Sequence, residues 1–336
     1  MLIIFGVALV LSLTFGSVQI PVNDVLHILI GQQPAHSPWM VIVLNFRLPK
    51  ALTAILAGSA LAISGLQMQT LFRNPLADPF ILGVSAGASL GAAIVVLAIG
   101  TTGTLLLAGL GLSGDFSLAS AASFGAASVL VLVLLVSRGA RSTLTLLILG
   151  LMFNYITTGI VSLLFYFSIP ERLKTYLAWT FGSFGGVTWG QLVVMAPVIV
   201  LGIFIAYLLP KQLNVMLLGE TYARSMGLNV RQTRWWIIIS ASILAGTVTA
   251  FCGPIGFLGI AVPHLCRGLF NTSDHRLLIP AATLLGAILA LLADLAAQMP
   301  GSQYVLPLNA VTSLLGAPVV IWVLLRQPNL QTGGMA

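Results

Sequence analysis

The stretch PKQLNVMLLGETYARSMGLNVRQTR, residues 210–234, decides the fold because it concentrates charge in a chain that is otherwise almost wholly apolar. Its charged residues are Lys211, Glu220, Arg224, Arg231 and Arg234. Apolar residues recur between them at helical spacing, and Gly219 and Gly227 stand where one short helix can end and the next can turn. The pattern predicts a small folded segment outside a membrane. A loop that only holds two neighbouring spans in register is the plainer alternative.

The rest of the chain is too apolar for a water-soluble domain. Of its 336 residues, 58% are hydrophobic and 6% are charged, and the formal net charge is +7. Because the basic residues are scattered at the ends of apolar runs, they indicate membrane topology and no nucleic-acid partner. Cys252 and Cys266 lie in apolar segments without a CxxC motif or a Cys/His array, so neither a disulfide framework nor a metal site is predicted. We expect an all-α membrane protein.

Apolar runs predict about ten transmembrane helices. They cover residues 1–16, 51–72, 79–100, 116–137, 142–169, 188–209, 235–270, 277–299 and 302–325, and the run 235–270 holds two spans separated at Gly253-Pro254. The first run is short for a span of ~20 residues. With no lysine or arginine before Arg47 it lacks the basic start of a secretory signal, so we expect a first helix with a trimmed N-terminal turn. Residues 17–50 are expected to form an extracytoplasmic loop, and residues 176–187 a short surface helix.

Two sequence features concern the arrangement of the spans. Gly58, Ala62 and Gly65 give one helix a face of small residues that allows close contact with another helix. The tripeptide at residues 82–84, LGV, is echoed by LGI at residues 258–260. This similarity is the sequence evidence for an inverted repeat that would relate spans two to five to spans seven to ten.

The distribution of basic residues predicts the orientation. With residues 210–234 in the cytoplasm, ten basic residues fall on the same side: Arg73, Arg138, Arg141, Lys211, Arg224, Arg231, Arg234, Arg267, Arg276 and Arg326. Four fall on the other side: Arg47, Lys50, Arg172 and Lys174. Because cytoplasmic loops are enriched in lysine and arginine, we expect both termini in the cytoplasm.

A polar stripe runs along the span at residues 142–169. At ~100° per residue, Thr143, Gly150 and Thr157 fall on one side of a helix, with Asn154 and Thr158 beside them. Leucine, isoleucine and phenylalanine occupy the far side. The stripe is either the lining of a transport path or a face of small residues that packs against another helix.

Asp294 is the one carboxylate well inside an apolar run. A charged group at that depth costs ~2.5 kcal/mol or more and is a functional candidate by default. It could relay protons in a secondary transporter. Against this, no second carboxylate lies within a span, and we expect no intramembrane lysine or arginine to pair with it. A structural role is therefore favoured for Asp294, as it is for His264, and the absence of HExxH and GxSxG motifs argues against an intramembrane hydrolase.

Six stretches carry a resemblance to a known family: GETYARSMGL at 219–228, RLPKALTAILAGSALAISG at 47–65, RNPLADPFILGVSAGASLG at 73–91, GFLGIAVPHLCR at 256–267, LLADLAA at 291–297 and LPLNAVTSLLGAPVVIWVLL at 306–325. In content and order they resemble the FecCD-type permeases, the membrane subunits of binding-protein-dependent ABC importers for iron chelates, haem and cobalamin. The resemblance implies a type II ABC importer-like fold in the bacterial inner membrane. Residues 1–336 would form a single permease domain, with residues 210–234 as its cytoplasmic coupling segment.

The resemblance also implies partners. They are a second copy of the chain or a close paralogue, two cytoplasmic ATPase subunits and an extracytoplasmic substrate-binding protein. The chain has no GxxxxGKS or GxxxxGKT motif, so ATP and Mg²⁺ are expected on the ATPase subunits and no cofactor on this chain. We therefore expect a translocation subunit with no catalytic residue of its own.

Site residues follow from the same resemblance. Contact with the ATPase is expected from Gly219, Glu220, Ala223, Arg224, Gly227 and Leu228. Arg47 and Lys50 match basic positions that dock carboxylates of the binding protein in the cobalamin member, although ordinary interfacial anchoring is an alternative. A third such position is Gln298 here, which puts that contact in doubt. Ser142 and Thr143 match the cytoplasmic gate, where a helix N-cap is the alternative.

The stripe suggests the cargo. Hydroxyl and amide groups without a fixed charge let a bulky molecule pass without being held, whereas a bare metal ion requires converging carboxylate, thiolate or imidazole ligands. We expect a large ferric-siderophore-like chelate, with haem or cobalamin next in order. A proton-coupled secondary transporter that uses Asp294 is the rival hypothesis. The sequence leaves open which chelate is carried and whether the dimer is homomeric.

Overall fold

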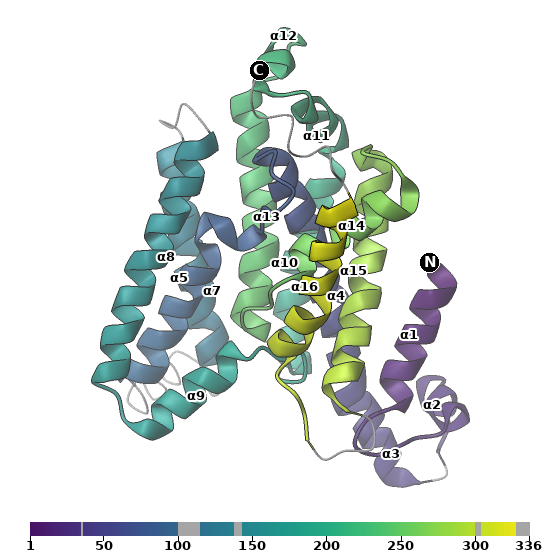
Figure 1. The fold of residues 1–336 in the computed structure, drawn as a ribbon. Coiled ribbons are helices and arrows are strands. Elements are labelled where there is room, and N and C mark those ends of the chain that lie inside the picture. The colour runs from purple at the N-terminus through teal and green to yellow at the C-terminus, as the bar shows by residue number, and fades with distance from the viewer. Residues whose placement is uncertain (35, 100–114, 138–142, 300–303, 327–336) are drawn as a thin grey trace.

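In the computed structural model, residues 1–34, 36–99, 115–137, 143–299 and 304–326 are described, and this part of the chain contains helices and no strand. The longer helices are α1 (Leu2–Thr14), α4 (Leu48–Leu71), α5 (Val84–Ala93), α7 (Asp115–Ser137), α8 (Thr143–Tyr166), α9 (Pro170–Thr180), α10 (Trp189–Tyr207), α13 (Val230–Cys252), α14 (Leu258–Phe270), α15 (His275–Ala297) and α16 (Leu308–Arg326). Figure 1 shows most of them running along one common direction, as spans of a bundle do. The predicted all-α fold is confirmed.

Six stretches of helix are long and apolar enough to cross a membrane: Ser37–Leu71, Ser117–Val136, Thr145–Tyr166, Trp189–Tyr207, Val230–Cys252 and His275–Ala297. Four apolar helices are shorter, at Leu2–Thr14, Val84–Leu97, Leu258–Phe270 and Leu308–Ile321. A perpendicular span needs ~20 residues. The total of ten spans therefore stays a prediction.

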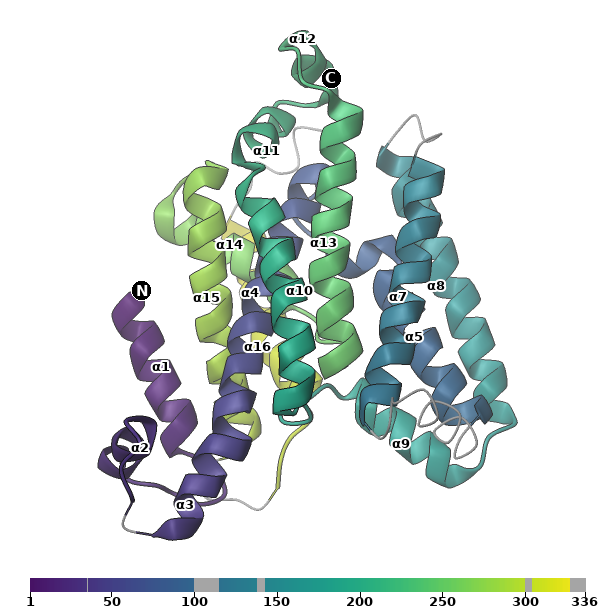
Figure 2. The same ribbon diagram turned by 180° about the vertical axis from the view of Figure 1, so that it is seen from behind.

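Helix α4 lies at the centre of the larger group of helices, between α10, α13 and α15 (Figures 1 and 2). Its small residues let neighbouring backbones approach closely, as predicted. A Cβ atom added to Gly58 would lie 2.2 Å from the carbonyl oxygen of Gly286 on α15, and one added to Gly65 would lie 1.8 Å from that of Gly259 on α14. Only glycine allows contact this close.

Side-chain hydrogen bonds reinforce α4 on two sides. Ser59 Oγ donates to the carbonyl of Thr283 on α15 at 2.8 Å, and Ser64 Oγ donates to that of Ala241 on α13 at 2.9 Å. Gln67 Nε2 donates to Ser240 Oγ, also on α13, at 3.0 Å. These groups are buried, so each bond satisfies a polar atom that water cannot reach.

Helices α5, α7, α8 and α9 form a second group beside the first (Figures 1 and 2). Close glycine contacts hold it together as well. A Cβ atom on Gly125 would lie 2.1 Å from the carbonyl oxygen of Gly87, joining α7 to α5. On α9, the Arg172 guanidinium donates to the carbonyl of Leu97 at 3.1 Å. The surface helix α9 is thereby fixed to the end of this group.

Two predicted segments differ from the structure. Residues 17–50 were expected to form a loop, but they contain α2 (Val22–Leu29), α3 (Ser37–Val41) and the π-helical turns of η1 (Ile42–Arg47), which run directly into α4. Pro38 stands in the first turn of α3, where a missing N–H costs nothing. Pro49 follows the wide turns of η1, which accommodate a proline that would break an ordinary helix.

The short surface helix also begins earlier than predicted. It spans Pro170–Thr180 instead of residues 176–187, because Pro170 favours a helix start and Gly182, with φ of +72°, follows its end. Arg172 and Lys174 therefore belong to α9. The predicted break at Gly253-Pro254 is confirmed, since α13 ends at Cys252 and α14 begins at Leu258.

Candidate functional site

The charged stretch 210–234 folds as two short helices at one end of the molecule. They are α11 (Pro210–Leu217) and α12 (Glu220–Ser225), and α12 stands at the top of Figure 1. Gly219 and Gly227 have φ of +100° and +83°, a conformation that glycine adopts without strain. The prediction that these glycines separate and end two short helices is confirmed. The last charged residues of the stretch, Arg231 and Arg234, belong to α13.

A partly buried ion pair joins α12 to α13. Arg234 is 5% exposed, and its Nη2 atom lies 2.5 Å from Glu220 Oε1. Arg224 approaches the same carboxylate less closely, at 3.7 Å, and its side chain is 65% exposed. Glu220 therefore orients α12 from within the molecule, whereas Arg224 remains open to an outside partner.

The exposed residues at and beside α12 include Arg224 and Gly227 of the predicted set and also residues outside it. Ala223 is 0% exposed, so it packs inside the segment and cannot itself contact a partner. Three large apolar side chains, Leu218, Tyr222 and Met226, are instead 57%, 67% and 61% exposed. We call these three residues the coupling face. Their spacing of four residues within a charged stretch was the sequence signal for it.

At the opposite end of the molecule, Arg47 is buried against α1. It is 8% exposed, and its Nη1 atom donates to the carbonyls of Leu13 at 2.7 Å and Thr14 at 2.9 Å. Its Nη2 atom donates to the carbonyl of Val18. The guanidinium thus satisfies carbonyls at the C-terminal end of α1, where a cation is electrostatically favoured.

Lys50 pairs with Asp294, which corrects the expectation that no basic residue within the membrane could do so. Lys50 Nζ lies 3.0 Å from Asp294 Oδ1, and Gln298 Nε2 donates to Asp294 Oδ2 at 2.7 Å. The pair forms because α4 and α15 are antiparallel, so the first turn of one helix meets the last turn of the other. Both oxygens of Asp294 are engaged, as a structural carboxylate requires. Whether Arg47 and Lys50 also dock a binding protein stays a prediction.

The polar stripe of α8 lines a groove. A hollow of about 480 Å³ lies between α8, α5 and α9, and Gly150, Asn154, Thr157 and Thr158 are among its lining residues. Ser85, Ser89 and Thr180 add three hydroxyls from the other helices. Among the described residues that line it, none carries a charge. The predicted stripe therefore faces this groove, and part of its length is not covered by another helix.

Members of the stripe differ in accessibility. Asn154 and Thr158 are exposed, whereas Thr157 is 7% exposed. Gly150 is buried, and a Cβ atom there would lie 1.9 Å from the carbonyl oxygen of Ile81, so Gly150 serves helix packing. Ser142 and the side chain of Thr143 lie outside the described residues.

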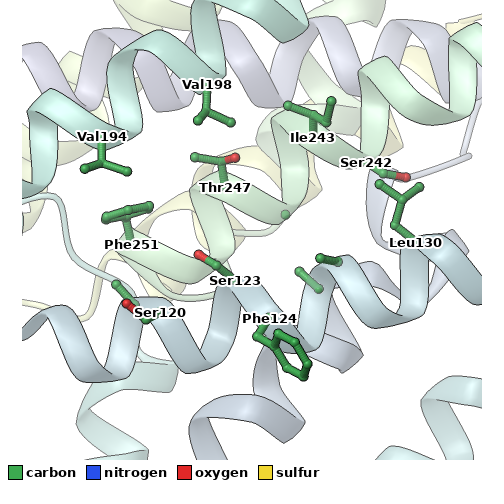
Figure 3. A pocket seen from close by; sticks show the side chains of 14 residues that line it. Ser120, Ser123, Phe124, Leu130, Val194, Val198, Ser242, Ile243, Thr247 and Phe251 are labelled. Atoms are coloured by element: carbon green, nitrogen blue, oxygen red, sulfur yellow. The ribbon is translucent and has the colours of Figure 1, made fainter. Parts of the chain in front are cut away.

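A larger hollow, about 690 Å³, lies between α7, α10 and α13 (Figure 3). Its lining is mainly alanine, valine, leucine and phenylalanine, with the hydroxyls of Ser120, Ser123 and Thr247 among them. None of the predicted site residues whose side chains the structure describes lines it. The predicted path and this larger hollow are thus different places in the molecule.

Comparison with known proteins places the chain in one family. The model of the FecCD transport family matches residues 2–326. The hemin transport system permease protein HmuU of Yersinia pestis is 37% identical over 291 residues, covering 86% of this chain and 85% of HmuU. The vitamin B12 import system permease protein BtuC of Salmonella arizonae is 38% identical over 284 residues, covering 84% of this chain and 83% of BtuC.

Solved structures agree. An inward-facing conformation of a transporter assigned to the metal-chelate ABC type has a TM-score of 0.83 and 28% identity, and the match covers 97% of both chains. PsaBC from Streptococcus pneumoniae, solved with a Fab, shares the fold at a TM-score of 0.58 and 15% identity. With a family model that matches nearly the whole chain, the protein belongs to the FecCD transport family.

Proposed function

We propose that this chain is the translocation subunit of an ATP-driven importer and that it carries a large ferric-siderophore-like chelate across the bacterial inner membrane by alternating access. Its relatives named for haem and vitamin B12 support an importer of bulky metal chelates. In this proposal both termini lie in the cytoplasm. A second copy or a close paralogue completes the central path.

The coupling face supports a cytoplasmic ATPase partner. Leu218, Tyr222 and Met226 expose large apolar side chains on a charged segment that projects from the bundle. Such groups in water favour burial against another protein, with aromatic residues and methionine enriched at such contacts. The ATPase subunits bind ATP and Mg²⁺, and this chain supplies no catalytic group.

At the opposite end we propose docking of an extracytoplasmic binding protein. Lys50 retains 20% side-chain exposure while it pairs with Asp294. A carboxylate of the binding protein could share this ammonium without separating the pair. Arg47 is buried against α1, so it would support docking indirectly by holding α1 in place beside the docking surface.

The groove along α8 is the observation that carries the cargo proposal. Its hydroxyl and amide groups offer many weak contacts, and its described lining holds no group that would bind a bare metal ion tightly. A path must release what it binds. A large chelate with its own oxygen-rich surface fits such a lining better than a free ion does.

Cysteine labelling tests the path. In a variant without Cys252 and Cys266, single cysteines replace Asn154, Thr158 or Ser162, all of which line the groove. We expect each to react with a water-soluble maleimide, at a rate that changes when ATP is trapped in the partner. Val193→Cys, 72% exposed on apolar α10, is the control: we expect this face of α10 to contact lipid, so the cysteine should stay unreactive. Protection at all three groove positions in every state would place the path elsewhere.

Competition among a ferric hydroxamate, haemin and cobalamin for ATP-driven uptake tests the cargo. The reconstituted importer should prefer the ferric hydroxamate. Preference for haemin or cobalamin would leave the importer class intact and change the substrate.

A further inference from the structure

Asn214, on α11 of the coupling segment, forms contacts that the proposed function has not used. Its Nδ2 atom donates to Asp274 Oδ1 at 2.6 Å. Its Oδ1 atom accepts from the backbone N–H of His275 at 2.8 Å and lies 2.8 Å from His275 Nδ1. The coupling segment is thus bonded to the first residues of α15.

The same network continues to α4. His275 Nε2 lies 2.8 Å from the Oγ1 atom of Thr70, in the last turn of α4, and His275 and Thr70 are both 0% exposed. One histidine side chain therefore joins the coupling segment to two helices of the central bundle.

The groups at one end of the network determine which atom donates and which accepts in each of its hydrogen bonds. The Asp274 carboxylate can only accept and the His275 N–H can only donate, which fixes the orientation of the Asn214 amide. Nδ1 of a neutral imidazole must then carry the proton, and Nε2 accepts from the Thr70 hydroxyl. Thr70 Oγ1 also lies 2.9 Å from the carbonyl of Leu66, but its one proton is needed by His275.

We propose that Asn214, His275 and Thr70 form a rigid joint that transmits displacement of the coupling segment to α4 and α15. Shearing α11 past these helices would leave buried polar atoms without partners, which costs more than moving the three elements together. This inference rests on the proposed function, because it assumes that an ATPase displaces the segment.

The other attachment of the segment leads to the same helix. Glu220 ties α12 to Arg234 of α13, and α13 is bonded to α4 through Ser240 and Gln67. Motion of either short helix therefore reaches α4. The joint makes Asn214, His275 and Thr70 positioning residues for transport, since none of them faces the groove of α8.

Spin labels can test the rigidity of the joint in this chain alone. Labels at Lys211→Cys on α11 and Leu292→Cys on α15, in a background lacking Cys252 and Cys266, report the distance between the two elements in nanodiscs. We expect a narrow distribution in the parent and at least a twofold broader one with Thr70→Val or Asn214→Leu. Thr70→Ser should restore the narrow distribution. Thr53→Val is the matched control, because it removes an equally buried hydroxyl from the other end of α4.

Transport measurements test the coupling role. In proteoliposomes containing the ATPase subunits and the binding protein, Thr70→Val should hydrolyse ATP but import at least fivefold less ferric hydroxamate per ATP, and Thr70→Ser should recover uptake. Unchanged distance distributions in both Thr70→Val and Asn214→Leu would overturn the joint, and broad distributions with normal uptake per ATP would overturn its role in coupling. If the parent chain bound no ATPase, the proposed function would fail, while the spin-label result would still decide the joint.

Discussion

Helices α4 and α15 are joined at both ends, but by different chemistry. At the end away from the coupling segment, Lys50 and Asp294 form an ion pair at 3.0 Å that retains some exposure. At the end that carries the coupling segment, Thr70, His275 and Asn214 form a neutral hydrogen-bonded chain whose central groups are fully buried. Between them the two helices touch through glycines.

The difference has a physical reason. A lysine on a flexible stem can exchange one carboxylate for another when a partner arrives, so an ion pair near the surface is adaptable. Uncharged groups without access to water have no such alternative and hold one geometry. An adaptable contact suits a docking surface, and a fixed contact suits the transmission of movement.

The glycine contacts between the two ends should give the largest effect. Gly58→Ala places a Cβ atom 2.2 Å from the carbonyl oxygen of Gly286 on α15, so α4 and α15 must separate and the contacts at both of their ends should be lost. We expect no monodisperse protein after detergent extraction, as measured by size-exclusion chromatography. Gly159→Ala, on α8 with nothing within 4 Å of the added atom, is the matched control. Equal yields of the two variants would contradict the close approach.

The ion pair should give the next largest effect. Lys50→Met leaves the Asp294 carboxylate buried without its charged partner. Breaking a buried pair costs 3–5 kcal/mol, and the partial exposure of Lys50 reduces the expected destabilisation to about 2 kcal/mol. The drop in Tm should largely disappear in the double variant Lys50→Met, Asp294→Asn, which no longer contains a buried charge. A double variant as unstable as Lys50→Met would show that the lost packing of the lysine stem is responsible.

Much of this arrangement could be predicted from the sequence, because it depends on local signals. Gly219 and Gly227 marked the ends of α12, Gly253-Pro254 marked the break before α14, and Gly58 and Gly65 marked a close helix contact. Each is a property of a few neighbouring residues. Composition alone indicated a membrane protein. The family resemblance, confirmed over residues 2–326, indicated which class of transporter it is.

The missed features depend on contacts between distant segments. Asp294 was expected to lack a basic partner because Lys50 was placed in a loop, whereas η1 and α4 carry it into the bundle beside α15. Ala223 was assigned to an ATPase contact by its place in a motif, but its burial depends on how α12 packs. Asn214 gave no sequence signal, since its partners Asp274 and His275 meet it only in the folded chain.

A smaller effect is expected when the charge of Asp294 is removed and its shape is kept. Asp294→Asn preserves hydrogen bonds to Lys50 or Gln298 but cannot carry a proton, so an ATP-driven importer should retain at least half of its uptake. A proton-coupled transporter would lose uptake entirely. Transport into liposomes with an imposed proton gradient, with and without the ATPase, separates the two. Gradient-driven uptake that needs no ATPase and is abolished in Asp294→Asn would overturn the importer proposal.

The smallest effect is expected at Arg224, and it tests whether burial, more than charge, decides which contacts matter. Arg224 lies 3.7 Å from Glu220 with its side chain 65% exposed, so water and salt screen the pair, and Arg224→Gln should change stability by less than about 0.5 kcal/mol. Arg234 pairs with the same carboxylate while almost fully buried, and Arg234→Gln should destabilise several times more. Thermal unfolding of both variants in the same detergent gives the comparison. Equal losses would mean that the carboxylate of Glu220, and not the burial of its partner, fixes α12 to the bundle.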